Sequence, residues 1–117
     1  MDLGPLSVDE WQLLSFFGSR PEYPHPDEQW PDSDAIFTIR DSDLELSFAI
    51  HPVDRNVRLI IQCRGQRIYE LNAMDVKDVR YSHDQWEILE IVLSDCESLS
   101  FRIKPHIELR QSVDNRL

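Results

Sequence analysis

Carboxylates are the most abundant residues in this chain that could do chemistry. The segments "PDEQWPDSD" (26–34) and "DSD" (41–43) bring acids close together, and glycoside hydrolases use paired carboxylates as acid and base. The chain holds 22 acidic residues among 117, so such pairs arise by chance and no particular pair is indicated. An enzyme would also need a histidine to meet a carboxylate in a cleft. The histidines are His25, His51, His83 and His106.

The histidines and cysteines lack the spacing of a metal or nucleophile site. His25 precedes Asp27 and Glu28, a weak nitrogen and oxygen cluster of a kind common in acidic loops. Neither HExxH nor CxxC is present, and Cys63 and Cys96 lie 33 residues apart. Cys63 alternates with apolar residues, which indicates core packing. We therefore expect no bound metal and two separate, reduced thiols.

Phosphate-binding motifs are absent as well. The chain has three glycines and neither a GxxxxGK[ST] nor a GxGxxG sequence, so no glycine-rich loop can cradle a nucleotide. We expect a protein that uses no cofactor and is not an enzyme.

Charge is the strongest compositional signal. The formal net charge is −10 at pH 7. Residues 1–45 hold eleven acids against two bases, while residues 46–117 hold eleven acids against ten bases. Nucleic acids and anionic membranes bind positive surfaces, so this composition argues against both and favours a basic protein partner. Five arginines near the central strands are expected to pair with the chain's own carboxylates. They are Arg55, Arg58, Arg64, Arg67 and Arg80.

Length and hydropathy predict a single soluble domain over residues 1–117. Domains of about 100 to 150 residues are common, and a chain of this size can bury a sizeable core. The N-terminal sequence has no signal-peptide pattern, and no run reaches the roughly 20 apolar residues that cross a bilayer. We expect a cytoplasmic location.

The first predicted element is a short helix, which with its caps covers residues 7–18. Ser7 is suited to be the N-cap, Glu10 completes a capping box, and Gly18 is suited to a left-handed C-cap. Residues 8–17 are expected to be helical. An apolar stripe on this helix should pack on the rest of the fold. The stripe comprises Val8, Trp11, Leu14 and Phe17, widened by Leu13 and Phe16.

A proline-rich acidic loop is predicted over residues 19–34. Its four prolines exclude a persistent helix or central strand. Loops of about 15 residues inside a compact domain are usually functional or disordered, and aromatic residues argue against disorder. We expect either a partner-binding surface or a structural strap that covers the sheet, and both roles can hold together. The candidate partner-binding residues are Glu22, Tyr23, Asp27, Glu28, Trp30, Asp32 and Asp34.

From residue 35 to residue 111 the apolar pattern has a period of two, which is typical of antiparallel strands with one buried face. The fold class is therefore α+β: a short N-terminal helix on a mostly antiparallel, curved β-meander or small sandwich of about six to eight strands. Residues 112–117 are expected to fray. The predicted strands are "AIFTIRD", "LELSFAIHP", "NVRLIIQCRG", "QRIYELN", "VKDVRYS", "QWEILEIVLSD", "SLSFRIKP" and "IELRQ".

The layout as a whole combines a short helix, a loop of the "FFGSRPEYPHPDEQWP" kind and strands ending in "LSFRIKPHIEL". It resembles the small, acidic immunity proteins of bacterial contact-dependent and polymorphic toxin systems. The resemblance implies a non-enzymatic protein, a monomer or weak homodimer, that neutralises a basic toxin such as a nuclease. Complementary charge gives such an inhibitor fast and specific association. The alternative is a small-molecule-binding or scaffold β module in which the loop is only a strap.

Overall fold

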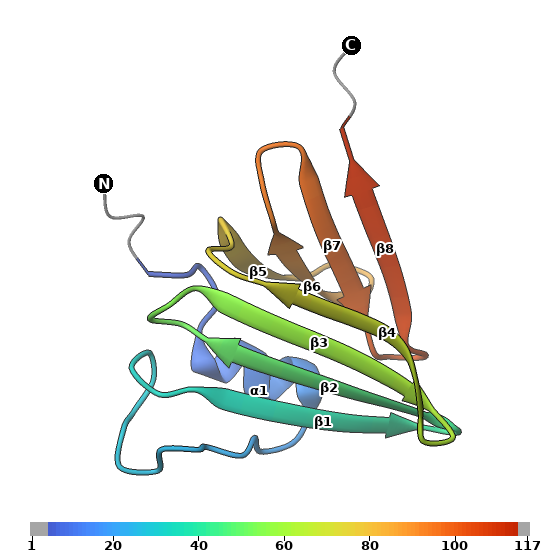
Figure 1. The fold of residues 1–117 in the computed structure, drawn as a ribbon, viewed down its shortest axis with the longest axis horizontal. Helices are drawn as coiled ribbons and strands as arrows, with labels where there is room; N and C mark the ends of the chain where they lie inside the picture. The colour runs from blue at the N-terminus through green and yellow to red at the C-terminus, as the bar shows by residue number, and fades with distance from the viewer. Residues whose placement is uncertain (1–4, 115–117) are drawn as a thin grey trace.

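The computed structural model describes residues 5–114 and contains one helix and eight antiparallel strands (Figure 1). Every strand predicted from the period-two pattern is present. Among the described residues, no helix has the length and apolar character that crossing a bilayer demands. The elements are α1 (Glu10–Phe17), β1 (Ala35–Asp41), β2 (Leu44–His51), β3 (Asn56–Cys63), β4 (Gln66–Ala73), β5 (Asp78–His83), β6 (Glu87–Val92), β7 (Glu97–Arg102) and β8 (Glu108–Val113).

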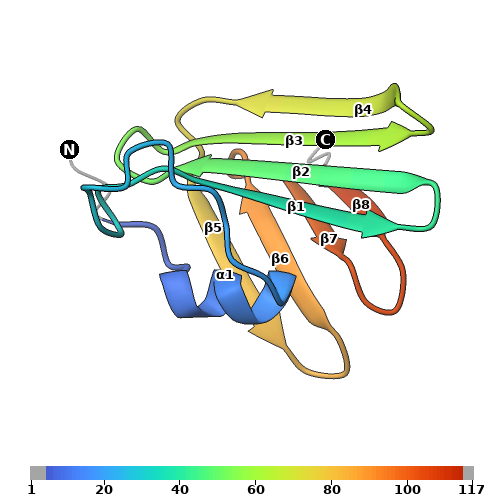
Figure 2. The same cartoon turned by 90° about the horizontal axis from the view of Figure 1, so that it is seen from below.

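The strands form two four-stranded sheets, in the orders β1-β2-β3-β4 and β5-β6-β7-β8. Sequential pairing holds within each sheet, but β4 and β5 do not pair, so a single continuous meander is wrong and the two-layer alternative is closer. The strands of the second sheet run obliquely across those of the first (Figure 2). Side chains from α1 and both sheets share one hydrophobic core.

The connection between the sheets is held by the β2–β3 turn. Arg55 donates hydrogen bonds from its guanidinium to the carbonyls of Val76, at 3.0 Å, and Lys77. Its own carbonyl accepts a bond from the Val76 amide at 2.9 Å. Val76 is buried between β4 and β5, where no described strand pairs with it. The bonds to Arg55 therefore satisfy backbone groups that would otherwise lack a partner.

The helix begins two residues later than predicted, at Glu10. Asp9 rather than Ser7 is the N-cap, and its capping-box partner is Gln12. The reason lies far along the chain, because the Ser7 amide and hydroxyl both donate to the carboxylate of Asp78. Residues 7 and 8 are thereby held beside β5, where the Val8 amide also donates to the Val79 carbonyl at 3.0 Å.

The apolar side of α1 also differs from the predicted stripe. Leu13, Phe16 and Phe17 are buried, whereas Trp11 is 63% exposed. Because Trp11 lies across the helix from this buried group, its inclusion in the stripe was wrong. The predicted C-cap is confirmed, since Gly18 has φ of 68° and its amide bonds to the Leu14 carbonyl.

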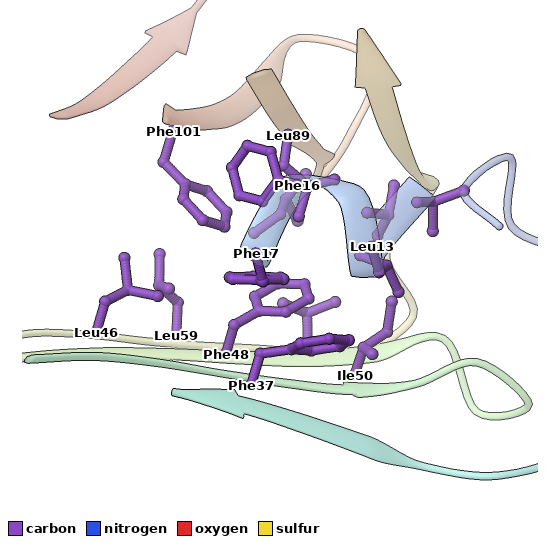
Figure 3. Close-up of a cluster of buried hydrophobic side chains, with 14 of the residues drawn as sticks. Leu13, Phe16, Phe17, Phe37, Leu46, Phe48, Ile50, Leu59, Leu89 and Phe101 are labelled. Atoms are coloured by element: carbon purple, nitrogen blue, oxygen red, sulfur yellow. The ribbon is translucent and has the colours of Figure 1, made fainter. Parts of the chain in front are cut away.

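Phe16 and Phe17 connect the two sheets through aromatic contacts (Figure 3). Phe17 stacks on Phe37 of β1, with ring centroids 4.4 Å apart, and on Phe48 of β2 at 5.6 Å. Phe16 meets Phe101 of β7 edge-on at 5.4 Å. The end of α1 therefore fills the space between the sheets.

Residues 112 and 113, which were expected to fray, belong to strand β8. Strand β8 continues to Val113, with Ser112 opposite Ser98 and Val113 opposite Glu97. The Asp114 amide donates to the Cys96 carbonyl at 2.6 Å. Cross-strand pairing thus orders the start of the segment, and residues 115–117 lie outside the described residues.

Replacing Phe17 with alanine should lower the free energy of unfolding by about 3 to 5 kcal/mol, because it removes the ring that stacks on the first sheet. Urea denaturation followed by circular dichroism measures the loss. Trp11→Ala on the exposed side of the same helix is the control, expected within about 0.5 kcal/mol of the parent. Equal losses for the two variants would contradict the proposed role of Phe17.

Asp78 should make stability depend on pH. Burial raises the pKa of its carboxyl, but hydrogen bonds from the Ser7 hydroxyl and amide and from Arg80 outweigh burial and hold the pKa below 3.8. A lowered folded pKa contributes stability above the unfolded value, and this contribution is lost as the pH falls through the folded pKa. At pH 7 the Asp78→Asn variant should therefore have a free energy of unfolding about 1 kcal/mol lower than that of the parent. Urea denaturation at a series of pH values measures the difference in free energy of unfolding between parent and variant, which should shrink below about pH 4. A difference that stays constant across pH would contradict the proposed role of the Asp78 carboxylate.

Candidate functional site

The Pro-rich loop, residues 19–34, runs back from the end of α1 to the start of β1 (Figures 1 and 2). After Gly18 reverses the chain, the Glu22 amide donates to the Ile36 carbonyl at 2.8 Å, and the Ile36 amide donates to the Glu22 carbonyl at 2.9 Å. This two-residue bridge fixes the loop beside β1. The prolines after it keep the chain out of the sheet, as predicted.

Tyr23 and Trp30 anchor the loop, and both are partly buried against the core. The Tyr23 hydroxyl donates to Oε2 of Glu10 at 2.9 Å. Burial and the adjacent Glu10 carboxylate raise the pKa of the Tyr23 phenol. Trp30 is followed by a cis peptide bond to Pro31. The loop is therefore a strap held to α1 and to the core.

Ser33 lies at the base of the loop and is completely buried. It precedes Ala35 and Phe37 on the same buried face, so the period-two pattern of β1 extends back into the loop. Its amide donates to the Gln29 carbonyl at 3.1 Å. Its hydroxyl oxygen has no hydrogen-bond partner within residues 5–114.

Trp30 separates two surface hollows. The first, which we call the loop pocket, has a volume of about 370 Å³ between α1 and the loop. The second has a volume of about 340 Å³, is mostly apolar, and carries Asp9 and Asp32. The loop pocket is lined by Glu10, Tyr23, Pro26, Glu28, Gln29, Trp30 and Ser33.

The loop carboxylates divide into free and engaged groups. Glu22, Asp27, Glu28 and Asp32 are exposed, and no ion pair with another described residue involves them. Asp34 differs, because its Oδ2 lies 2.8 Å from Nδ1 of His51. Six of the seven predicted residues thus lie on or beside exposed loop surface, while Asp34 fastens the loop to the end of β2.

Most of the central arginines pair with the chain's own carboxylates, as expected. The guanidinium of Arg55 donates to the backbone carbonyls of Val76 and Lys77. Both cysteines are free, and no cluster of three or more potential metal ligands occurs among residues 5–114. The pairs are Arg58 with Glu70 (3.6 Å), Arg64 with Asp43 (3.2 Å), Arg67 with Glu70 (2.6 Å) and Arg80 with Asp78 (3.2 Å).

Four residues that line the loop pocket were not among the predicted site residues: Glu10, Pro26, Gln29 and Ser33. Glu10 was assigned to a capping box, and only the return of the loop along α1 places it beside Tyr23. The burial of Ser33 could have been predicted from the sequence, because Ser33 lies two residues before Ala35 on the alternating buried face. Extending the strand pattern back across the loop boundary would have identified it.

No family model matches the chain, and no curated protein matches it. A solved structure shares its fold: a chain of the contact-dependent growth inhibition toxin–immunity protein complex from Klebsiella pneumoniae 342. The alignment has a TM-score of 0.71, covers 90% of this chain and 93% of that chain, and has 18% sequence identity. The likeness therefore extends over nearly the whole architecture, including both sheets.

Replacing Tyr23 with phenylalanine should loosen the strap, because the bond to Glu10 is lost while the ring remains. A Glu-specific protease should then cut after Glu22 or Glu28 several-fold faster, as about 1 kcal/mol of local stability corresponds to roughly a fivefold change in the open population. Tyr69→Phe in β4 is the control and should leave cleavage in the loop unchanged. Equal cleavage rates in both variants would contradict an anchoring role for the Tyr23 hydroxyl.

Proposed function

We propose that this chain is an immunity protein that binds and neutralises the toxin of a contact-dependent growth inhibition system. The observation that carries the proposal is the shared fold with a chain of such a toxin–immunity complex, over nearly the full length of both chains. At 18% identity the likeness concerns the fold, so the binding role is our inference from it.

Charge favours the immunity role over the toxin role. A toxin that cuts nucleic acid needs a basic cleft, whereas this chain has a net charge of −10 and its central arginines are engaged by its own acids. The partner would be a basic toxin, such as a nuclease. Opposite charge would speed the association of the two proteins and favour the correct partner.

The exposed face of the Pro-rich loop is the proposed contact surface. Asp27, Glu28 and Asp32 are exposed and form no ion pair with another residue of the described range 5–114, and the half-buried Trp30 supplies rigid contact area. Binding to a loop that is already fastened orders few additional residues, which favours affinity. The chain would act in the cytoplasm without catalysis, as a monomer or weak homodimer before it meets the toxin.

The space between the sheets gives no support to the alternative of a ligand-binding module. In that alternative the curved sheet and the helix would enclose a cavity, and here the rings of Phe16, Phe17, Phe48 and Phe101 pack together in that position.

The direct test is to isolate the partner by co-purification and then to measure protection of growth. A tagged form of the chain is purified from its native host, and proteins released between low and high salt are identified by mass spectrometry. We expect a basic protein that arrests growth when expressed alone and permits growth when this chain is coexpressed. A captured protein that is harmless alone, or whose toxicity persists on coexpression, would overturn the proposal.

Neutralising two loop acids should weaken binding to that toxin. The double variant Asp27→Asn with Asp32→Asn should raise Kd about tenfold, mainly through slower association, and should reduce the salt dependence. The matched control is Asp84→Asn with Asp95→Asn, which removes the same charge from exposed turns of the second sheet. Surface plasmon resonance at several salt concentrations compares them. Equal effects of the two double variants would show that overall charge, and not the loop surface, governs binding.

A further inference from the structure

The loop pocket has a composition that its role as a strap does not explain. Carboxylates of Glu10 and Glu28 and the indole of Trp30 line it, together with Ser33. Ser33 is completely buried, and its hydroxyl oxygen lacks a partner among the described residues. Buried polar groups are nearly always hydrogen-bonded, so this hydroxyl indicates a missing hydrogen-bond partner.

We propose, building on the proposed function, that the loop pocket receives one arginine side chain of the toxin. The guanidinium would lie against the face of the Trp30 indole and donate to the carboxylates of Glu10 and Glu28. After a small local opening at the base of the loop, a further N–H would donate to the Ser33 hydroxyl, which is completely buried in the free protein. Tyr23 prepares the site, because its bond to Oε2 orients the Glu10 carboxylate and leaves Oε1 for the incoming donor.

The chemistry of the pocket fits a guanidinium better than an ammonium. Two carboxylate residues and one tryptophan line the pocket, and a guanidinium has five N–H donors in a plane that can stack on an aromatic ring. An ammonium has three donors and is more strongly hydrated, so it uses fewer of these acceptors. A neutral side chain would leave two carboxylates facing it without compensation.

The pocket is large enough for an arginine side chain. Its volume of about 370 Å³ lies in one recess between α1 and the loop. The hollow on the other side of Trp30 also carries two carboxylates, Asp9 and Asp32, but its other lining residues are apolar and Ser33 is not among them.

The first test needs no toxin. The isolated protein is titrated with L-arginine amide and followed by ¹⁵N–¹H NMR, with the Trp30 indole N–H assigned by Trp30→Phe. We expect that signal and the Ser33 amide to move, with binding at least about fivefold tighter than for L-citrulline amide, which has a similar shape without the charge. L-Lysine amide should bind more weakly than arginine amide. Equal shifts with all three probes, or shifts confined to other parts of the protein, would overturn the proposal.

A matched pair of variants separates the pocket from general charge. Glu28→Gln and Asp27→Asn each remove one charge from neighbouring exposed positions, but only Glu28 lines the pocket. Glu28→Gln should weaken arginine amide binding about tenfold and Asp27→Asn less than about twofold. Ser33→Ala, which should keep the fold because alanine is small and apolar, is expected to cost about threefold. Equal losses for Glu28→Gln and Asp27→Asn would contradict the site.

The outcomes distinguish this inference from the proposed function. If arginine amide occupies the pocket but no toxin is neutralised, the site stands and the immunity role fails. If a toxin is neutralised and its affinity is unaffected by Glu28→Gln and Ser33→Ala, the immunity role stands and the arginine site fails.

Discussion

The architecture depends on two adjacent rings at the end of α1. Phe16 and Phe17 stand almost perpendicular to each other, with an interplanar angle of 88°, and consecutive helical side chains point in different directions. One ring therefore reaches Phe101 of the second sheet while the other stacks on Phe37 of the first. A helix of eight residues is not stable by itself in water, so these contacts hold the helix as much as the helix holds the sheets.

The position of the helix in turn determines where the Pro-rich loop can run. The chain leaves α1 at Gly18, between the sheets, and must return to Ala35 at the start of β1. The Glu22–Ile36 bridge and the Tyr23–Glu10 bond fasten this return path at two places. The candidate surface is consequently positioned by the same packing that closes the core.

Local patterns predicted the elements well, while long-range contacts determined what the sequence analysis got wrong. Strict alternation identified all eight strands, but alternation shows which side chains share a face and not where one sheet ends. The sequence analysis assigned the cap to Ser7 with Glu10, but Asp78, 71 residues away, binds Ser7, and Asp9 with Gln12 forms the cap instead. The prediction that Trp11 belongs to the buried side of α1 was wrong for a related reason. Which side of a short helix is buried depends on the elements that pack against it.

The loop shows why a strap and an interface can be the same structure. Its apolar side chains are turned inward, since Tyr23 and Trp30 pack against the core, and most of its acids are therefore left facing water. Fastening the backbone removes freedom before any partner arrives, so that less entropy is lost on binding. Carboxylates that already had internal partners would have to break those ion pairs to bind a cation. Glu28 and Asp32 have none among the described residues, whereas Asp34, which has His51, contributes to holding the loop instead.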